Sequence, residues 1–288
     1  MTKENSFLRA RFEELKTEHP KLDILDFLRR CRVEYLLNTD LLKLVDEIAL
    51  YRIKKQIRDK IPETPLGPEL ENNFDQSEYI KQIEKVGNAI LSRLEDPGLK
   101  NLIELFRKDD NIVREIGNCV LKTEYQYFVN LAKTIGIDVD LLTFIVDTPF
   151  IPAYRELSIL DPEELYNVRN RRCLVCGRLI NLGVYKRRKL FLFCKLCRTR
   201  IHVDQFRCHN CGNPDSYQLC FYMLEGQPEL KLEYCKVCKT YFKTADEDKI
   251  GNVDDPLLLD IATLDYDSLA QEKGLSSSNT ETEEHKPS

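Results

Sequence analysis

Eight cysteines between residues 173 and 238 fall in four Cys-x-x-Cys pairs, a spacing that is typical of metal ligands. The two-residue gap lets both thiolates of a pair reach one metal ion from a tight turn, and two pairs complete a tetrahedral shell. The pattern therefore predicts two metal ions per chain, each bound by four cysteines. A disulfide framework is disfavoured, because we expect no secretory leader on this chain. The predicted ligands are Cys173, Cys176, Cys194, Cys197, Cys208, Cys211, Cys235 and Cys238.

The order of the pairs indicates how they combine. Glycine follows the first and third pairs, at Gly177 and Gly212, whereas a basic residue follows the second and fourth pairs. This alternation favours one knuckle–hairpin–knuckle unit that occurs twice, with site one in 173–197 and site two in 208–238. The alternative is an interleaved arrangement, in which the first pair combines with the third and the second with the fourth.

Four thiolates in tetrahedral geometry suit zinc or iron, and the spacing does not choose between them. Zinc would make both sites structural, whereas iron would make them rubredoxin-like. Because all four ligands at each site come from the protein, neither metal keeps an open position for hydrolysis. This saturation argues against a metallohydrolase.

Hydrophobic patterns predict the elements that position these cysteines. Residues 179–185 and 190–193 form one expected β-hairpin, and residues 217–224 and 230–234 form another. Upstream, apolar residues recur at helical spacing, after Asp40 and most clearly in the stripe Tyr79, Ile83, Val86, Ile90 and Leu94.

The predicted fold is therefore α+β, an N-terminal α-helical bundle followed by two tandem rubredoxin-like or zinc-ribbon modules with four cysteines each. Prolines at 62, 65 and 68 indicate a loop over 61–75. The expected divisions are an α-helical domain in 1–160, a metal-ribbon domain in 161–250, a C-terminal acidic helix in 251–272 and a disordered tail in 273–288.

The remaining cysteines, Cys31, Cys119 and Cys220, are interpreted as packing residues. The net charge is −5, and the first sixteen residues mix both signs of charge without an apolar stretch. No apolar run approaches the ~20 residues that a bilayer requires. We expect a soluble cytoplasmic protein without membrane insertion.

Charge is distributed unevenly within the cysteine region. Residues 169–211 hold twelve Lys and Arg residues against one acid, Asp204. The excess is explained either by solvation and compensation of the thiolates, or by an anionic partner. The second explanation supports an alternative function, a tandem zinc-ribbon protein that binds nucleic acid. A thiol oxidoreductase is a weaker hypothesis, because a redox Cys-x-x-Cys pair normally stands alone at a helix start.

The cysteine region resembles the formate dehydrogenase accessory proteins, the FdhE family. Cys194-Lys-Leu-Cys197, ten intervening residues with Ile201-His202-Val203, and Cys208-His-Asn-Cys211-Gly212 are similar to that family's central signature. Residues 233–243 resemble its last knuckle, and residues 255–265 resemble its closing acidic helix. Departures include Ile201, where the family usually has tryptophan, and the absence of glycine after the second and fourth pairs.

The resemblance implies a cytoplasmic, non-catalytic maturation factor with rubredoxin-like centres. Its partner would be the catalytic subunit of a molybdenum- or tungsten-dependent formate dehydrogenase. The basic face at Arg198, Arg200 and Arg207 is the expected contact. His202 occupies a family-like position between the ribbons, where it would either contact the partner or satisfy a backbone carbonyl.

Overall fold

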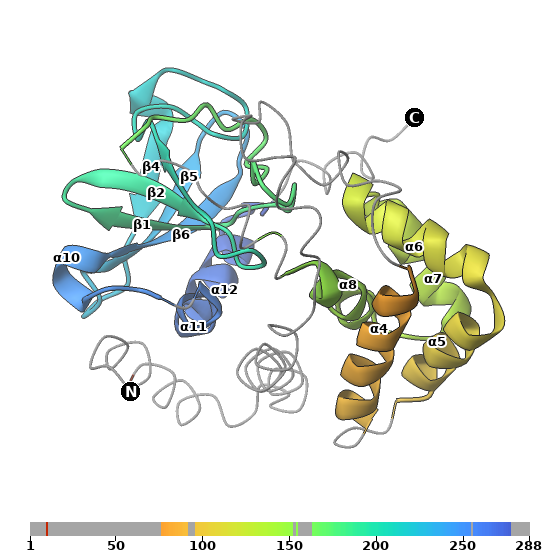
Figure 1. Ribbon diagram of the computed structural model, residues 1–288. Coiled ribbons are helices and arrows are strands. Elements are labelled where there is room, and N and C mark those ends of the chain that lie inside the picture. Colours follow the sequence, from red (N-terminus) through yellow and green to blue (C-terminus); the bar gives the residue numbers. More distant parts are fainter. Residues whose placement is uncertain are drawn as a thin grey trace, which may run out of the picture. The chain divides into compact units, whose positions relative to one another are not determined.

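The computed structural model describes Ala10 and residues 76–91, 96–151, 154, 163–254 and 256–277. These residues form two compact units, one with helices α4 to α8 and one with a β-sheet and helices α10 to α12 (Figure 1). The mixed α+β class predicted from the sequence is confirmed. Cys31, the helix expected after Asp40 and the loop expected over 61–75 lie outside the described residues.

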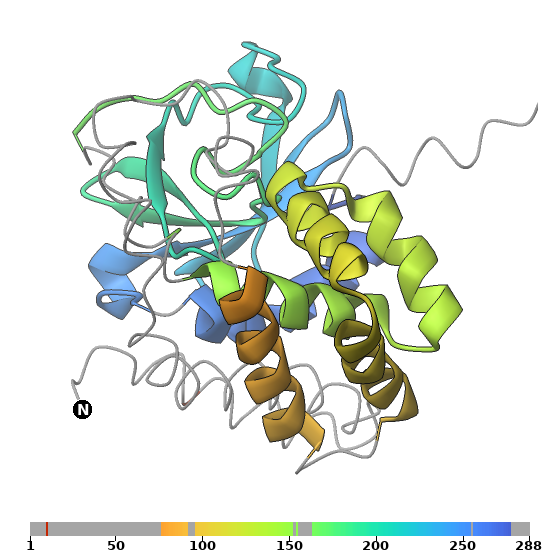
Figure 2. The same ribbon diagram turned by 45° about the vertical axis from the view of Figure 1, so that its right-hand side comes forward.

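The helical unit follows the predicted stripes. Its elements are α4 (Gln76–Leu91), α5 (Pro97–Lys108), α6 (Asp110–Lys122), α7 (Tyr125–Ile135), α8 (Val139–Asp147) and the short 3-10 helix η3 (Thr148–Phe150). Figures 1 and 2 show these helices from two directions. Four residues of the predicted α4 stripe are buried, namely Tyr79, Ile83, Val86 and Ile90.

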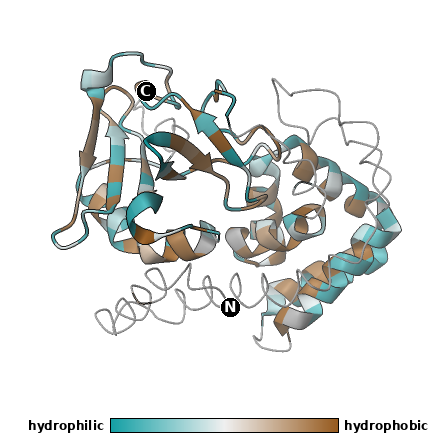
Figure 3. Ribbon diagram, turned by 60° about the vertical axis from the view of Figure 1, so that its left-hand side comes forward, coloured by the Kyte–Doolittle hydropathy of each residue, from teal (hydrophilic) through white to brown (hydrophobic). Residues whose placement is uncertain are grey.

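Local signals set where the helices begin and end. Asp96 accepts a hydrogen bond from the backbone N–H of Leu99 at 2.8 Å, and so caps the start of α5. Thr123 ends α6 in the left-handed conformation, with φ of 59°. The Tyr79 hydroxyl then ties α4 to α8 by donating to the carbonyl of Val146 at 2.9 Å. Figure 3 shows helices striped in hydrophobic and hydrophilic colours, as expected when one face is buried.

Six strands form one sheet in the second unit. They are β1 (Leu182–Lys186), β2 (Lys189–Phe193), β3 (Arg200–Val203), β4 (Leu219–Tyr222), β5 (Leu230–Cys235) and β6 (Tyr241–Asp246). The order across the sheet is β3-β2-β1-β6-β5-β4. Both predicted hairpins are present, β1 with β2 and β4 with β5, and each gains a third strand after its second knuckle.

The two ribbons share hydrogen bonds along one seam. Strands β1 and β6 pair in parallel, with Leu182 opposite Lys243 and Tyr185 opposite Asp246, whereas every other pair in the sheet is antiparallel. The expected tandem modules are therefore fused, because each three-stranded ribbon would otherwise leave an unpaired edge at this position.

The parallel seam also fixes where the cysteines lie. Corresponding strands of the two ribbons run in the same direction, since β1 and β6 are parallel and each ribbon alternates. The C-terminal ends of β2 and β5 therefore lie on the same side of the sheet, and a cysteine knuckle begins at each of these ends. The two strands are three positions apart, which corresponds to about 14 Å at the usual interstrand spacing.

Helices α10 (Glu247–Ile250), α11 (Pro256–Ala262) and α12 (Leu264–Glu272) follow the sheet. The sequence predicted one acidic helix in 251–272, whereas the chain breaks at Thr263, whose hydroxyl donates to the carbonyl of Leu259 at 2.7 Å. Residues of α11 and α12 share a buried apolar cluster with one face of the sheet, which includes Leu182, Val184, Phe193, Leu232, Leu259 and Tyr266.

The start of the predicted disordered tail is ordered instead. Leu275 is buried, and Ser276 forms a parallel bridge with Thr240 beside the last knuckle. The Ser276 N–H donates to the carbonyl of Lys239, and the Tyr241 N–H donates to the carbonyl of Ser276, both at 3.0 Å. Composition alone missed this segment, because its bonds are made by backbone groups. Residues 278–288 lie outside the described part of the chain.

Candidate metal centres

The eight paired cysteines lie in two groups of four. Within each group the sulfur atoms are within 4.8 Å of one another, and the grouping follows the sequential pairing of the chain. The sulfur–sulfur distance is 3.5 Å between Cys173 and Cys197, 3.7 Å between Cys208 and Cys238, and 3.9 Å between Cys211 and Cys235. A tetrahedral metal with bonds of about 2.3 Å places its sulfurs about 3.8 Å apart. Each group could therefore hold a metal ion.

All ten cysteines in the described part of the chain are free thiols, which does not fit a disulfide framework. Cys220 lies in β4 and belongs to neither group. Cys119 lies in α6 with its thiol near the Glu124 carboxylate at 3.4 Å. Burial, followed by the hydrogen bond to Glu124, raises the pKa of the Cys119 thiol to about 12.

The knuckles share one backbone turn. In three of them, the N–H after the second cysteine donates to the first cysteine's carbonyl at 2.9–3.0 Å, from Arg198, Gly212 and Lys239. The residue after the second cysteine has positive φ in all four, namely 73° at Gly177, 60° at Arg198, 76° at Gly212 and 57° at Lys239. The missing glycines therefore do not change the turn, because the basic residues adopt the left-handed conformation in their place.

Two threonines complete the sulfur environment. The Thr199 hydroxyl lies 2.9 Å from the Cys197 sulfur, and the Thr240 hydroxyl lies 3.0 Å from the Cys238 sulfur. Hydrogen bonds to the charged form of a thiol stabilise the thiolate. At Cys238, the hydrogen bond from Cys208, followed by those from Thr240, holds the thiol pKa well below its usual value. Thr199 and Thr240 were not predicted from the sequence, although both stand at the end of a repeated Cys-x-x-Cys-basic-Thr motif.

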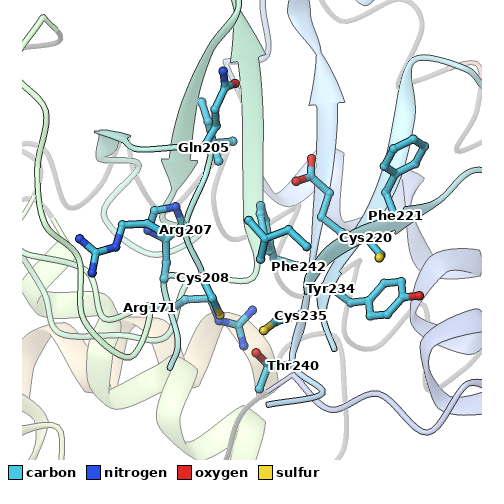
Figure 4. Close-up of a pocket in the computed structure, with 14 residues that line it drawn as sticks. Arg171, Gln205, Arg207, Cys208, Cys220, Phe221, Tyr234, Cys235, Thr240 and Phe242 are labelled. Atoms are coloured by element: carbon cyan, nitrogen blue, oxygen red, sulfur yellow. The ribbon is translucent and has the colours of Figure 1, made fainter. Parts of the chain in front are cut away.

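The two sites differ in exposure. All four cysteines of site one are buried, whereas in site two Cys211 is exposed and Cys238 is half-buried. A cavity of about 70 Å³ lies against site two, and its lining includes Arg171, Arg207, Cys208, His209 and Cys235 (Figure 4). Site two is therefore the four-cysteine site that solvent and small molecules can reach more readily.

Arg171 is the most unusual residue of this cavity. It is 2% exposed and is the largest fully buried side chain among the described residues. Its guanidinium donates to the carbonyls of Tyr241 and Ser277. Burial lowers the Arg171 pKa to about 10, and the nearby Cys208 and Cys238 thiolates oppose this effect. The group therefore remains charged at neutral pH.

Part of the positive charge in the basic stretch 169–211 is paired with acidic residues of the same chain. Arg200 donates to both oxygens of Glu247, at 3.0 and 2.6 Å, and lies over the Phe193 ring. Lys195 pairs with Asp260 at 2.8 Å, and Lys189 pairs with Glu163 at 2.5 Å. These ion pairs, of which that between Lys189 and Glu163 is exposed, weaken the case for a polyanion-binding face.

The other expected contact residues have different surroundings. His202 stacks at 5.2 Å against Phe191, and its backbone carbonyl accepts the Tyr166 N–H at 2.8 Å. Arg207 lines the cavity and reaches the Gly212 carbonyl at 3.4 Å. Arg198 is half-buried at its knuckle. Because Arg200 is committed to Glu247, it is a weaker candidate for a partner contact than Arg207, which lies at the cavity.

A buried lysine connects the sheet to the C-terminal helices. The Lys243 side chain is fully buried, and its ammonium lies 2.7 Å from Asp260 and 2.6 Å from Asp267. Burial alone would raise the pKa of Asp260, but the charges of Lys195 and Lys243 outweigh it and hold that pKa well below its usual range. Since Lys195 belongs to the second knuckle, this cluster ties site one to α11.

Comparison with known proteins agrees with this geometry. Residues 206–282 match the family model described as FdhE, C-terminal domain. The matched segment contains all four cysteines of site two, strands β4 to β6 and helices α10 to α12. The C-terminal part of the chain is thus similar to FdhE proteins. The family resemblance drawn from the cysteine motifs is thereby confirmed.

Individual FdhE proteins match over different lengths. An FdhE homolog from Cronobacter sakazakii is 31% identical over 120 residues, which cover 40% of this chain and 38% of the relative. An FdhE homolog from Aquifex aeolicus is 26% identical over 183 residues, which cover 57% of this chain and 63% of the relative. The chain thus spans between about two fifths and under two thirds of the length of these curated relatives.

A solved FdhE structure extends the fold comparison. The crystal structure of the FdhE protein from Pseudomonas aeruginosa superposes with a TM-score of 0.54 and 18% sequence identity, over 94% of both chains. The likeness covers the helical and the sheet units and establishes the shared fold. Within the described residues, no helix is both long enough and apolar enough to cross a bilayer.

Proposed function

We propose that this protein is a non-catalytic accessory factor in the assembly of formate dehydrogenase. The observation that carries the proposal is the match of residues 206–282 to the FdhE C-terminal domain, because that segment includes site two. In this proposal the eight paired cysteines bind two metal ions, and the partner is the catalytic subunit of a molybdenum- or tungsten-dependent formate dehydrogenase.

The chemistry of the two sites supports a binding role. Four sulfur donors saturate a tetrahedral ion, so neither site would offer a position for substrate. The metal would stabilise the knuckles, which small β-ribbons cannot stabilise through their own cores. Contact with the partner is assigned to two basic residues beside the knuckles, Arg198 after the second knuckle and Arg207 at the cavity of site two.

Deletion of the protein tests this function. Formate-dependent dye reduction should be lost while the catalytic subunit is still synthesised, and the wild-type chain should restore the activity. The double variant Arg198→Glu with Arg207→Glu should keep both metals but lose co-purification with the subunit. Cys119→Ser is the matched control, because Cys119 lies in α6 of the helical unit.

Normal formate dehydrogenase activity in a deletion strain without a paralogue would refute the proposal. A gel shift with steep salt dependence would then favour the nucleic-acid alternative, because phosphate contacts release counterions. Retained co-purification of the double variant would instead overturn only the assignment of the contact face.

A further inference from the structure

Arg171 belongs to ribbon one by sequence but to site two by position. It precedes Cys173 by two residues, and its N–H donates to the carbonyl of His209 in the third knuckle at 3.0 Å. Its guanidinium lies at the cavity with Cys208, Cys235 and Thr240, as Figure 4 shows. Arg171 therefore precedes the first ligand of site one in sequence, but its charge lies beside site two.

In the described part of the chain, the charge of Arg171 has no acidic partner. Its guanidinium donates to two backbone carbonyls there, and the Nε atom makes no hydrogen bond to a described residue. Arginine remains protonated in proteins, and a buried cation without a counter-charge is strongly unfavourable. A compensating negative charge must therefore lie close to this side chain.

Site two supplies that charge. Four thiolates around a divalent ion carry a net charge of −2, and Cys208 of site two lines the same cavity as Arg171. Negative charge on Cys208, Cys238 and Tyr241 favours the charged form of Arg171. The equivalent position before the third knuckle is Phe206, which is 62% exposed and uncharged. A buried basic residue two positions before the first cysteine thus occurs in the first unit of the repeat and not in the second.

We propose that Arg171 is the built-in counter-charge of site two, so that metal binding at site two depends on a residue held by ribbon one. The inference goes beyond the accessory function and concerns this chain alone. It makes the two sites unequal, since the metal at the more exposed site is retained with the help of a buried cation. It also couples the sites, because the backbone of Arg171 is anchored between His209 and Ile180, whose N–H donates to the Arg171 carbonyl at 2.8 Å.

Metal affinity measured at each site tests the proposal. Arg171→Met removes the charge while keeping an unbranched side chain, and Arg169→Met makes the same charge change at an exposed position. Cadmium-113 NMR of the full chain should resolve the two cadmium–thiolate signals, and chelator titration should then empty the sites separately. Arg171→Met should weaken cadmium binding at site two by roughly 10- to 100-fold, the range found for residues that support metal ligands. Arg169→Met should leave both sites unchanged.

The reduction potential of iron bound at site two distinguishes an effect of the Arg171 charge from a purely structural role of this residue. A nearby cation favours the more negative ferrous form, so in the iron-loaded protein Arg171→Met should lower the potential of site two alone. Arg171→Lys keeps the charge but loses the planar fork, and it should retain cadmium affinity within about threefold. It also serves as the test if the methionine variant does not fold. Equal affinity losses at both sites, no loss at either site, or a lysine variant as weak as methionine would overturn the proposal.

Discussion

Arg198 and Lys239 hold the same left-handed backbone conformation, with φ of 60° and 57°, one residue after their knuckle cysteines. The other two knuckles place Gly177 and Gly212 at this position, with φ of 73° and 76°. The left-handed region costs an L-residue about 1–2 kcal/mol, whereas glycine adopts it freely. The second and fourth knuckles therefore carry backbone strain that the first and third do not.

Lys239→Gly should accordingly stabilise the metal-loaded protein by about 0.5–1 kcal/mol, after allowance for the extra freedom of glycine in the unfolded chain. Gly212→Ala is the matched reverse change. An added Cβ would make only an ordinary contact with the Arg207 guanidinium at 4.0 Å, so strain alone should cost about 1 kcal/mol. Denaturant unfolding followed by tyrosine fluorescence measures both, and stabilisation by Gly212→Ala would contradict this account.

Site two should lose metal before site one. Cys211 is exposed, whereas every cysteine of site one is buried. With a chelator and an alkylating reagent present, peptides containing Cys208, Cys211, Cys235 and Cys238 should be labelled first. Mass spectrometry over time gives the order. Simultaneous labelling of Cys176 and Cys211 would show that the sites open together.

Thr240→Val should weaken metal binding at site two by roughly tenfold, because the hydroxyl that lies 3.0 Å from the Cys238 sulfur is removed without loss of volume. Thr199→Val should have the same effect at site one, where the corresponding distance to Cys197 is 2.9 Å. Each variant is the control for the other in a chelator competition. An effect on both sites from one variant would indicate a general loss of fold.

Lys243→Met should cost about 3–5 kcal/mol of unfolding free energy, because it leaves Asp267 without its buried cation and Asp260 with Lys195 alone. Lys249→Met is the control. Lys249 pairs with Asp246 at 3.4 Å on the surface, and loss of an exposed pair of this kind costs at most about 1 kcal/mol. Equal costs for the two variants, measured by denaturant unfolding at pH 7, would argue against the buried cluster.

The grouping of the eight cysteines could be predicted from the sequence, because a ligand pair in a tight turn is a local feature. The hairpin turns and the stripe on α4 were predictable for the same reason. The parallel pairing of β1 with β6 was not, since it joins residues 182 and 243 through backbone groups that any side chains permit.

Charges were the least predictable feature. By sequence, Arg171 and Arg200 belong to one basic stretch, and counting charges could not assign either residue to solvent, to the thiolates or to a partner. In the fold, Arg171 is buried against site two, and Arg200 binds Glu247, which lies 47 residues further along the chain. Only the tertiary pairing separates a surface charge from an internal one.

The seam between β1 and β6 has a consequence for biosynthesis. While the chain emerges from the ribosome, β1, β2 and β3 can associate as soon as they are available, but the free edge of β1 waits for residues 241–246. An open strand edge invites pairing with other chains. During that interval the nascent protein is most open to misassembly, and a translational pause between residues 203 and 241 would prolong it.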